Sequence, residues 1–185
     1  MRTFVAIEID RAIIEKLEAI RGRLKKADAD VKWVEPENSH LTIKFIGEID
    51  PGMVDDVKAA MQQAAAAAKP FDLAIRTAGS FPRGRAPRVL WVGADDDSGN
   101  LARLHAELDH ALATLGIEPE DREFSAHLTL GRVRSGKNAR RLTELLDAEN
   151  PAELGSSHAG SLTLFESTLG PRGPKYSPLA HIQLG

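Results

Sequence analysis

Two short stretches of the sequence place a histidine and a threonine two residues apart. They are residues 40–43 (His-Leu-Thr-Ile) and residues 127–130 (His-Leu-Thr-Leu), and each lies in an apolar run typical of a β-strand. Because side chains alternate between the two faces of a strand, His40 and Thr42 share one face and the aliphatic residues share the other. His127 and Thr129 follow the same pattern. Each strand therefore presents a proton carrier beside a hydroxyl group, and the two together suit a phosphate ester held between them.

The elements of the first half that must position its motif follow from the apolar spacing. A strand is expected at residues 4–9, then a helix capped by Asp10 with Ile13, Leu17, Ile20 and Leu24 on its buried side. A short strand at 31–34 precedes the motif strand at 41–46, which Gly47 ends. Asp50 and Pro51 begin a second helix that reaches Pro70, and residues 71–75 form a closing strand.

The second half repeats this order of elements. A strand is expected at residues 88–93, followed by a helix capped by Ser98 with Leu101, Leu104, Leu108 and Leu115 on its buried side. The second motif strand spans 124–130, and Asn138 caps a helix that Pro151 closes. Further strands are expected near 161–167 and 179–184.

The spacing of these elements indicates an internal duplication. His40 follows Phe4 by 36 residues, and His127 follows Val89 by 38 residues. We therefore expect an α+β fold of two pseudo-symmetric lobes, each an antiparallel-rich sheet with helices on its outer face. The His-x-Thr-x strands would face a central cleft. Residues 1–185 would form a single bilobal domain with sequence repeats at approximately 1–80 and 85–185.

Composition is typical of a soluble globular protein. The chain has 185 residues, of which 42% are hydrophobic and 28% charged. It has no cysteine, which excludes disulfides and thiolate chemistry. The apolar start is interrupted by Glu8 and Asp10 and is too short for a signal peptide, and no apolar run approaches the length of a membrane span. We therefore expect a cytoplasmic protein that does not associate with membranes.

Charge is distributed unevenly along the chain. The net charge of −3 argues against nonspecific coating of nucleic acid. Residues 82–88 nevertheless carry three arginines and no acid, and residues 132–141 carry five basic residues and no acid. Acidic residues concentrate at 95–97 and 118–123. The basic runs are either solvated surface or a surface that binds RNA.

The four other histidines are weaker candidates for chemistry. His105 and His110 lie in a leucine-rich helical pattern, and His158 and His181 lack a threonine partner, so all four are expected to be surface or packing residues. Two motif histidines fall short of the three protein ligands that a catalytic zinc ion usually takes. We expect no metal and no cofactor.

The chain resembles the 2H phosphoesterase superfamily, named for its paired His-x-Thr-x motifs. More narrowly, it is similar to the bacterial and archaeal RNA 2′,3′-cyclic phosphodiesterases, also called 2′–5′ RNA ligases. The resemblance spans nearly the whole chain and rests on both motifs and on residues 2–7, 44–47, 81–82, 87–93, 131–132, 164–170 and 173–176. One departure is Ala126, where the family usually has proline before the second histidine.

The resemblance implies roles for five residues. His40 would be the proton donor, His127 the proton acceptor, and Thr42 and Thr129 would bind phosphate oxygens. Arg132 matches a family position near the phosphate. Strict alternation would turn Arg132 toward the core, so the strand must bulge or end at Gly131 for Arg132 to reach the cleft.

The implied activity is metal-independent hydrolysis of RNA 2′,3′-cyclic phosphodiester ends to 2′-phosphomonoesters, with reversible 2′–5′ ligation, by a monomer. Two alternatives remain open at this point. One is another 2H phosphodiesterase, acting on 2′–5′ oligonucleotides or on a cyclic nucleotide metabolite. The other is a non-catalytic module that binds RNA ends, although binding alone does not require two opposed proton carriers.

Overall fold

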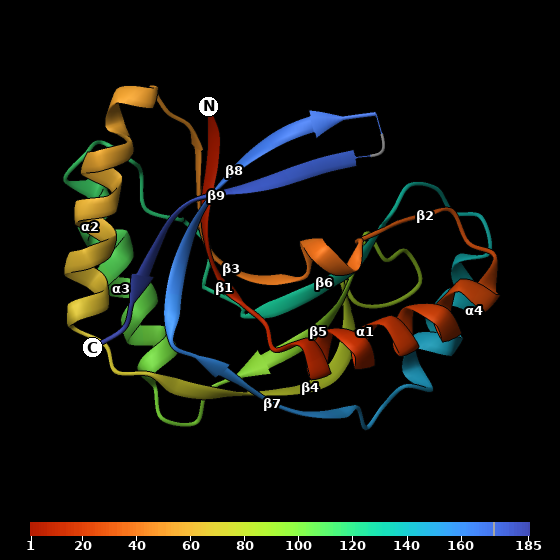
Figure 1. Ribbon diagram of the computed structural model, residues 1–185. Helices are drawn as coiled ribbons and strands as arrows, with labels where there is room; N and C mark the ends of the chain where they lie inside the picture. The colour runs from red at the N-terminus through yellow and green to blue at the C-terminus, as the bar shows by residue number, and fades with distance from the viewer. Residues whose placement is uncertain (172) are drawn as a thin grey trace.

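The computed structural model describes residues 1–171 and 173–185, whose strands form two antiparallel sheets (Figure 1). The four-stranded sheet has the order β3-β1-β8-β9 and comprises β1 (Arg2–Glu8), β3 (His40–Glu48), β8 (Ser161–Gly170) and β9 (Gly173–Gln183). The five-stranded sheet has the order β2-β6-β5-β4-β7 and comprises β2 (Val31–Trp33), β4 (Phe71–Phe81), β5 (Val89–Asp95), β6 (His127–Val133) and β7 (Glu153–Ala159).

Each sheet carries its own pair of helices. The helices α1 (Arg11–Leu24) and α4 (Ala139–Asp147) contact strands of the five-stranded sheet, whereas α2 (Val54–Ala66) and α3 (Asn100–Ala113) pack on each other and on the four-stranded sheet (Figure 1). Short 3₁₀ turns lie at η1 (Lys25–Ala27), η2 (Pro36–Asn38) and η3 (Pro51–Met53). These two lobes confirm the expected α+β class. Among the described residues, no helix has the length and apolar character needed to cross a membrane.

The lobes do not coincide with the two halves of the sequence. The four-stranded sheet joins β1 and β3 to the C-terminal strands β8 and β9, and the five-stranded sheet joins β2 and β4 to β5, β6 and β7. The helix α1 follows β1 but packs on the other sheet, and α3 follows β5 but packs beside β3. Because each half contributes to both lobes, neither half contains a complete core. The motif strands β3 and β6 come into contact where the sheets adjoin.

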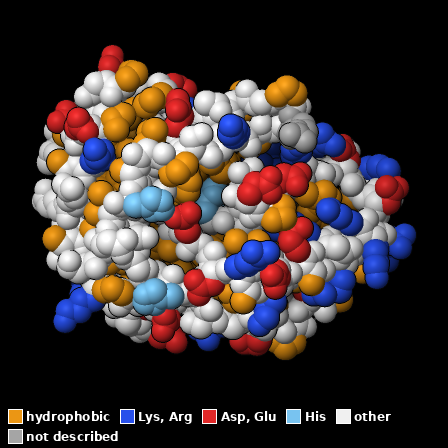
Figure 2. Space-filling view, in the orientation of Figure 1, with side chains coloured by type: hydrophobic (Ala, Val, Ile, Leu, Met, Phe, Trp, Pro, Cys, Tyr) orange, Lys and Arg blue, Asp and Glu red, His pale blue; other side chains and the backbone are white. Residues whose placement is uncertain are grey.

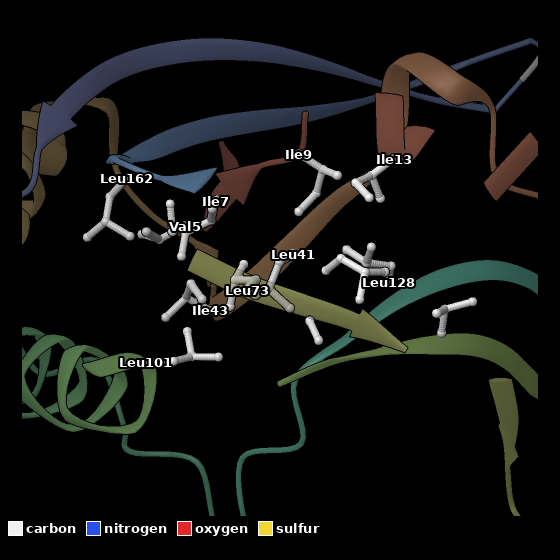
Figure 3. Packing of buried hydrophobic residues seen from close by; sticks show 14 of the residues in the cluster. Val5, Ile7, Ile9, Ile13, Leu41, Ile43, Leu73, Leu101, Leu128 and Leu162 are labelled. Carbon is white, nitrogen blue, oxygen red and sulfur yellow. The ribbon is translucent and has the colours of Figure 1, made fainter. Parts of the chain in front are cut away.

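The core is continuous across both lobes. Figure 3 shows Leu41 and Ile43 of β3 in the same cluster as Leu128 of β6, with β1 side chains above them. Leu41, Ile43, Leu128 and Leu130 are each at most 2% exposed. Burying an aliphatic side chain of this size stabilises the fold by about 1.5–3 kcal/mol. The predicted aliphatic face of both motif strands is thus confirmed, and it fixes which way the polar face points.

Several expected strand boundaries were wrong. Gly47 does not end β3, because its φ of +87° is accommodated at a register shift opposite Thr3 and the strand continues to Glu48. The second motif strand begins at His127, and residues 124–126 before it are irregular. The strand β7 was not predicted, since its sequence of small and polar residues lacks an apolar alternation.

The positions at which the helices start were predicted better than the hydrogen bonds that cap them. Asp50 accepts a hydrogen bond from Gly52 N, as expected of a cap. Asp10 precedes α1, yet its carboxylate accepts from His158 N. Ser98 Oγ accepts from Asn100 N at 3.3 Å, but Gly99 occupies the cap position of α3, and the carboxylate of Asp96 accepts from Leu101 N at 2.7 Å. Asn138 precedes α4, but its side-chain amide donates to Asp28 O.

Candidate active site

The two motifs have matching burial patterns. In β3, His40 and Thr42 are half-buried while the aliphatic residues between and after them are buried. In β6, His127 and Thr129 show the same alternation. The polar members of each motif therefore share one face of their strand, as predicted from the period of two.

Both motif strands bulge at the fourth residue of the motif. Thr42 pairs with Ala6 and Lys44 with Val5, which leaves Ile43 as the extra residue in β3. In β6, Thr129 pairs with Trp91 and Gly131 with Leu90, which leaves Leu130 as the extra residue. A bulge reverses the alternation that follows it, so the next residues, Lys44 and Gly131, are buried and the ones after them, Phe45 and Arg132, are exposed.

The bulge explains how Arg132 leaves the core side of the strand. The expected break in alternation is present, centred on Leu130 rather than on Gly131. Gly131 is needed for close packing, because a Cβ there would lie 2.7 Å from Val31 Cγ1 and 3.0 Å from Trp33 Cε3. Burial raises the pKa of Tyr176 in β9, and the positive charge of Arg132 opposes that rise. The Tyr176 ring lies 5.2 Å from the His40 ring.

His40 is held among aromatic rings. Its ring stacks on Phe4 with centroids 4.9 Å apart, and Tyr176 contacts it edge-on. Its Nε2 lies 3.1 Å from Thr42 Oγ1. Burial lowers the pKa of His40 to about 4, against a backbone hydrogen bond to Asn38 that favours the charged form. In the free protein His40 is therefore neutral at pH 7.

His127 has its tautomer fixed by a backbone contact. Its Nδ1 lies 2.7 Å from the carbonyl oxygen of Ser125, which can only accept, so Nδ1 carries the hydrogen. In the neutral ring the lone pair is then on Nε2. The Phe81 ring contacts His127 edge-on at 5.2 Å. This arrangement prepares His127 Nε2 to accept a proton.

A buried arginine connects the two motif strands. Arg21 of α1 is 1% exposed and ion-pairs with Glu18. Its Nε donates to the carbonyl of Leu130, the bulged residue of β6. Its Nη2 donates both to Ser39 Oγ, at 2.9 Å, and to Thr129 O, at 3.5 Å. One guanidinium group thus contacts the residue before His40 and the threonine of the second motif.

The first motif strand has a buried charge of its own. Lys44, the residue after the β3 bulge, is 1% exposed. Its Nζ lies 2.5 Å from Asp109 Oδ1 of α3 and donates to Glu118 O at 2.9 Å. Sequence reasoning missed both anchors. In the sequence, each anchor is marked only by a charged residue that directly follows a buried position of an amphipathic helix. Arg21 follows Ile20, and Asp109 follows Leu108.

The remaining histidines lie outside this arrangement. His105 stacks on Phe124 as a packing residue, His110 is exposed, and His158 pairs with Asp72 on the surface. His181 hydrogen-bonds Thr163 and faces Glu8. Within residues 1–171 and 173–185, no cluster of three or more His, Cys, Asp or Glu side chains could hold a metal ion.

The surface beside His40 is hollowed. A cavity of about 140 Å³ is lined by His40, Phe165 and Tyr176 together with the acidic side chains of Glu8 and Glu37. Figure 2 shows histidine side chains near the middle of this face, with acidic side chains beside them. The first motif is therefore open to a ligand from this side.

Comparison with known proteins identifies the family. The family model for LigT-like phosphoesterases matches residues 7–91 and again residues 92–176. A protein of Methanothermobacter thermautotrophicus named RNA 2′,3′-cyclic phosphodiesterase is 35% identical over 184 residues, covering 100% of this chain and 99% of its own length. A protein of Aquifex aeolicus with the same name is 32% identical over 188 residues, covering 100% of this chain and 98% of its own length.

Solved structures share the fold. The crystal structure of TT0787 from Thermus thermophilus superposes with a TM-score of 0.82 at 25% identity and covers 100% of this chain and 98% of that one. E. coli LigT complexed with 3′-AMP superposes with a TM-score of 0.77 at 24% identity and covers 99% of this chain and 97% of that one. The fold and the paired motif strands define a hydrolase of the two-histidine phosphoesterase class. Within that class, the chain belongs to the LigT-like phosphoesterase family.

Arg21→Met tests the buried connection between the motif strands. The change removes the donors to Leu130, Thr129 and Ser39 and leaves Glu18 without its partner. Buried hydrogen bonds of a charged group contribute about 1.5–3 kcal/mol each, so losing those to Leu130 and Ser39 should lower the free energy of unfolding, measured with urea, by about 3–5 kcal/mol.

Arg23→Met is the matched control on the same helix. Arg23 is half-exposed and pairs with Glu149, so its loss should cost less than about 1 kcal/mol. Equal stability of the two variants would contradict the assigned role of Arg21.

Proposed function

We propose that this protein hydrolyses RNA 2′,3′-cyclic phosphodiester ends to 2′-phosphomonoesters without a metal ion, and that it also joins a cyclic end to an RNA 5′-hydroxyl in a reversible 2′–5′ ligation. The observation that carries the proposal is the pair of matched His-x-Thr-x strands in contact between two sheets. Relatives over the full chain length are named RNA 2′,3′-cyclic phosphodiesterase. The protein would act as a monomer made of one bilobal domain, residues 1–185, with repeats at approximately 1–80 and 85–185, in the cytoplasm where RNA ends are processed.

In this proposal His127 is the proton acceptor. Its Nδ1 hydrogen bond to Ser125 O leaves the Nε2 lone pair available to take a proton from water. The water oxygen attacks phosphorus, and a P–O bond forms as the bond to one ribose oxygen breaks. Holding the ring in one tautomer removes a reorganisation step from this transfer.

His40 is the proton donor to the departing ribose oxygen. To donate a proton, His40 must be a charged imidazolium, yet burial holds the pKa of His40 in the free protein at about 4. A phosphodiester anion bound beside the ring favours the charged form and raises this pKa, so the substrate itself would promote protonation of its acid. An imidazolium that is only marginally stable is also a strong acid toward an alkoxide leaving group.

Three further side chains would bind the phosphate oxygens. Thr42 and Thr129 lie on the same strand faces as the histidines, and their hydroxyls can donate to non-bridging oxygens. Arg132 is turned to the exposed side by the bulge at Leu130 and can balance the negative charge. A cyclic phosphodiester carries a single charge, which these donors can neutralise by the logic of an oxyanion site.

Alanine substitution tests whether the two histidines act as one unit. His40→Ala or His127→Ala should lower the turnover of a 2′,3′-cyclic mononucleotide by about 100-fold or more, the usual scale of lost acid or base catalysis. The double variant should be far less impaired than the product of the two single effects. His110→Ala, which removes an exposed histidine of α3, serves as the control. Near-normal turnover by either single variant would refute the mechanism.

The product identifies which ribose oxygen faces the acid. In-line displacement places the attacking water and the leaving oxygen on opposite sides of phosphorus. If His127 activates water and His40 protonates the leaving group, the 3′ oxygen must face His40 and the phosphate remains on the 2′ oxygen. Phosphorus NMR of a digested cyclic-ended oligonucleotide should show a 2′-phosphate. A predominant 3′-phosphate would reverse the ribose orientation, and a mixture would mean that the cleft does not fix it.

A further inference from the structure

Opposite charges lie at the two ends of the strand pair that carries the second motif. One end is basic, because the loop 82–88 between β4 and β5 contributes three arginines, Arg83, Arg85 and Arg88. Arg132 of β6 lies at the same end, since it is the strand-pairing partner of Val89, the first residue of β5. At the other end, β5 leads into the acidic residues 95–97, and the acidic segment 118–123 precedes β6. Figure 1 shows β5 running from this loop toward α3. A polyanion is therefore attracted to one end of the strand pair and repelled from the other.

The arginines at the basic end are available to a ligand. Arg83, Arg85, Arg88 and Arg132 are exposed, and within the described part of the chain their guanidinium groups form no ion pair or hydrogen bond. Several basic residues elsewhere are paired with acids. Arg76 pairs with aspartates at the acidic end, and the nearby Arg134 and Lys137 pair with Asp30 and Asp28. The loop thus has no protein acid that a phosphate would have to displace.

The basic loop begins next to the second motif. Phe81, the last residue of β4, contacts the His127 ring at 5.2 Å, and the loop follows it directly. The loop closes at Arg88, whose N donates to Phe81 O and whose carbonyl accepts from Val133 N, each at 2.8 Å. Arg132 and the three arginines of the loop 82–88 thus lie at the same end of the strand pair, and we call these four residues the basic track.

We propose that the nucleotides preceding the cyclic end of an RNA strand lie along this track, with their backbone phosphates bound by Arg88, Arg83 and Arg85. The proposal rests on the proposed function for the identity of the terminal group. Arginine binds phosphate oxygens through two parallel N–H donors, which suits a repeating phosphate backbone without reading its bases. The preferred substrate is then an oligoribonucleotide with a free cyclic end, and the strand leaves the site toward the loop and away from residues 95–97.

A comparison of substrates of two lengths distinguishes binding along the track from the reaction at the two histidines. For the full chain, kcat/KM on a cyclic-ended hexanucleotide should exceed that on a 2′,3′-cyclic mononucleotide by about tenfold or more at low salt. The variant Arg83→Ala/Arg85→Ala/Arg88→Ala should lose this preference while its turnover of the mononucleotide is unchanged. Because each bound phosphate of a single strand contributes about 0.7 to the slope of log affinity against log salt, the slope should fall by about 2.

A charge-matched control removes three exposed basic residues elsewhere. Lys69→Ala/Arg103→Ala/Arg122→Ala changes the net charge equally and includes a residue of the acidic end, so it should keep the length preference and the salt slope. The proposal is overturned if the native chain has no length preference, if the loop variant retains it, or if the control loses it equally.

Binding measured without turnover distinguishes this proposal from the proposed function. Fluorescence anisotropy of a labelled hexanucleotide ending in a 2′-phosphate should show weaker binding by the loop variant, by about tenfold or more, and unchanged binding by the control. If these binding results are obtained while no cyclic end is hydrolysed, the proposed activity is wrong and the proposed RNA-binding surface is supported. If cyclic mononucleotides are hydrolysed but both variants bind the hexanucleotide like the native chain, the surface is wrong and the activity stands.

Discussion

The geometry of the site depends on one buried guanidinium group. Arg21 contacts Ser39, immediately before the first motif, and the carbonyls of Thr129 and Leu130 in the second. Those carbonyls lie at the bulge of β6, where the Leu130 oxygen accepts from both Val34 N and Arg21 Nε. An arginine can satisfy three acceptors in different directions at once because its five donors are fixed in a plane. The two strands that carry the histidines are thereby held in one relative position by a residue that contacts neither histidine ring.

The Lys44–Asp109 pair gives the other motif strand an equivalent anchor. Both motif strands bulge at the fourth residue of the motif, and a helix that follows a strand of the other sheet contributes a charged side chain beside each bulge. This exchange of helices explains why the repeats do not form separate lobes. The helix of each half stabilises the motif strand of the opposite half, so the two motif histidines are positioned by elements from the whole chain.

Local patterns predicted which face of each motif strand is polar, and tertiary contacts decided how the two strands are held. The alternation of His40 with Leu41 and of His127 with Leu128 is a property of any half-buried strand, so the polar faces of both motifs could be predicted. The position of Arg132 required a break in that alternation, which the sequence implied but could not centre on Leu130. Arg21 could not be recognised, since a helical arginine is usually solvated and the two carbonyls of β6 that it contacts lie more than a hundred residues away. The strand β7 lacked an apolar pattern altogether.

One phosphate that contacts both histidines can be detected by NMR of the imidazole nitrogens in the full chain, titrated with adenosine 2′-monophosphate. The Nε2 resonances of His40 and His127 should shift together with a single dissociation constant. The pKa of His40 should also rise well above its free value of about 4 when the phosphate is bound. A nucleotide that saturates the protein while perturbing only one of the two imidazoles would show that the two histidines do not share a phosphate.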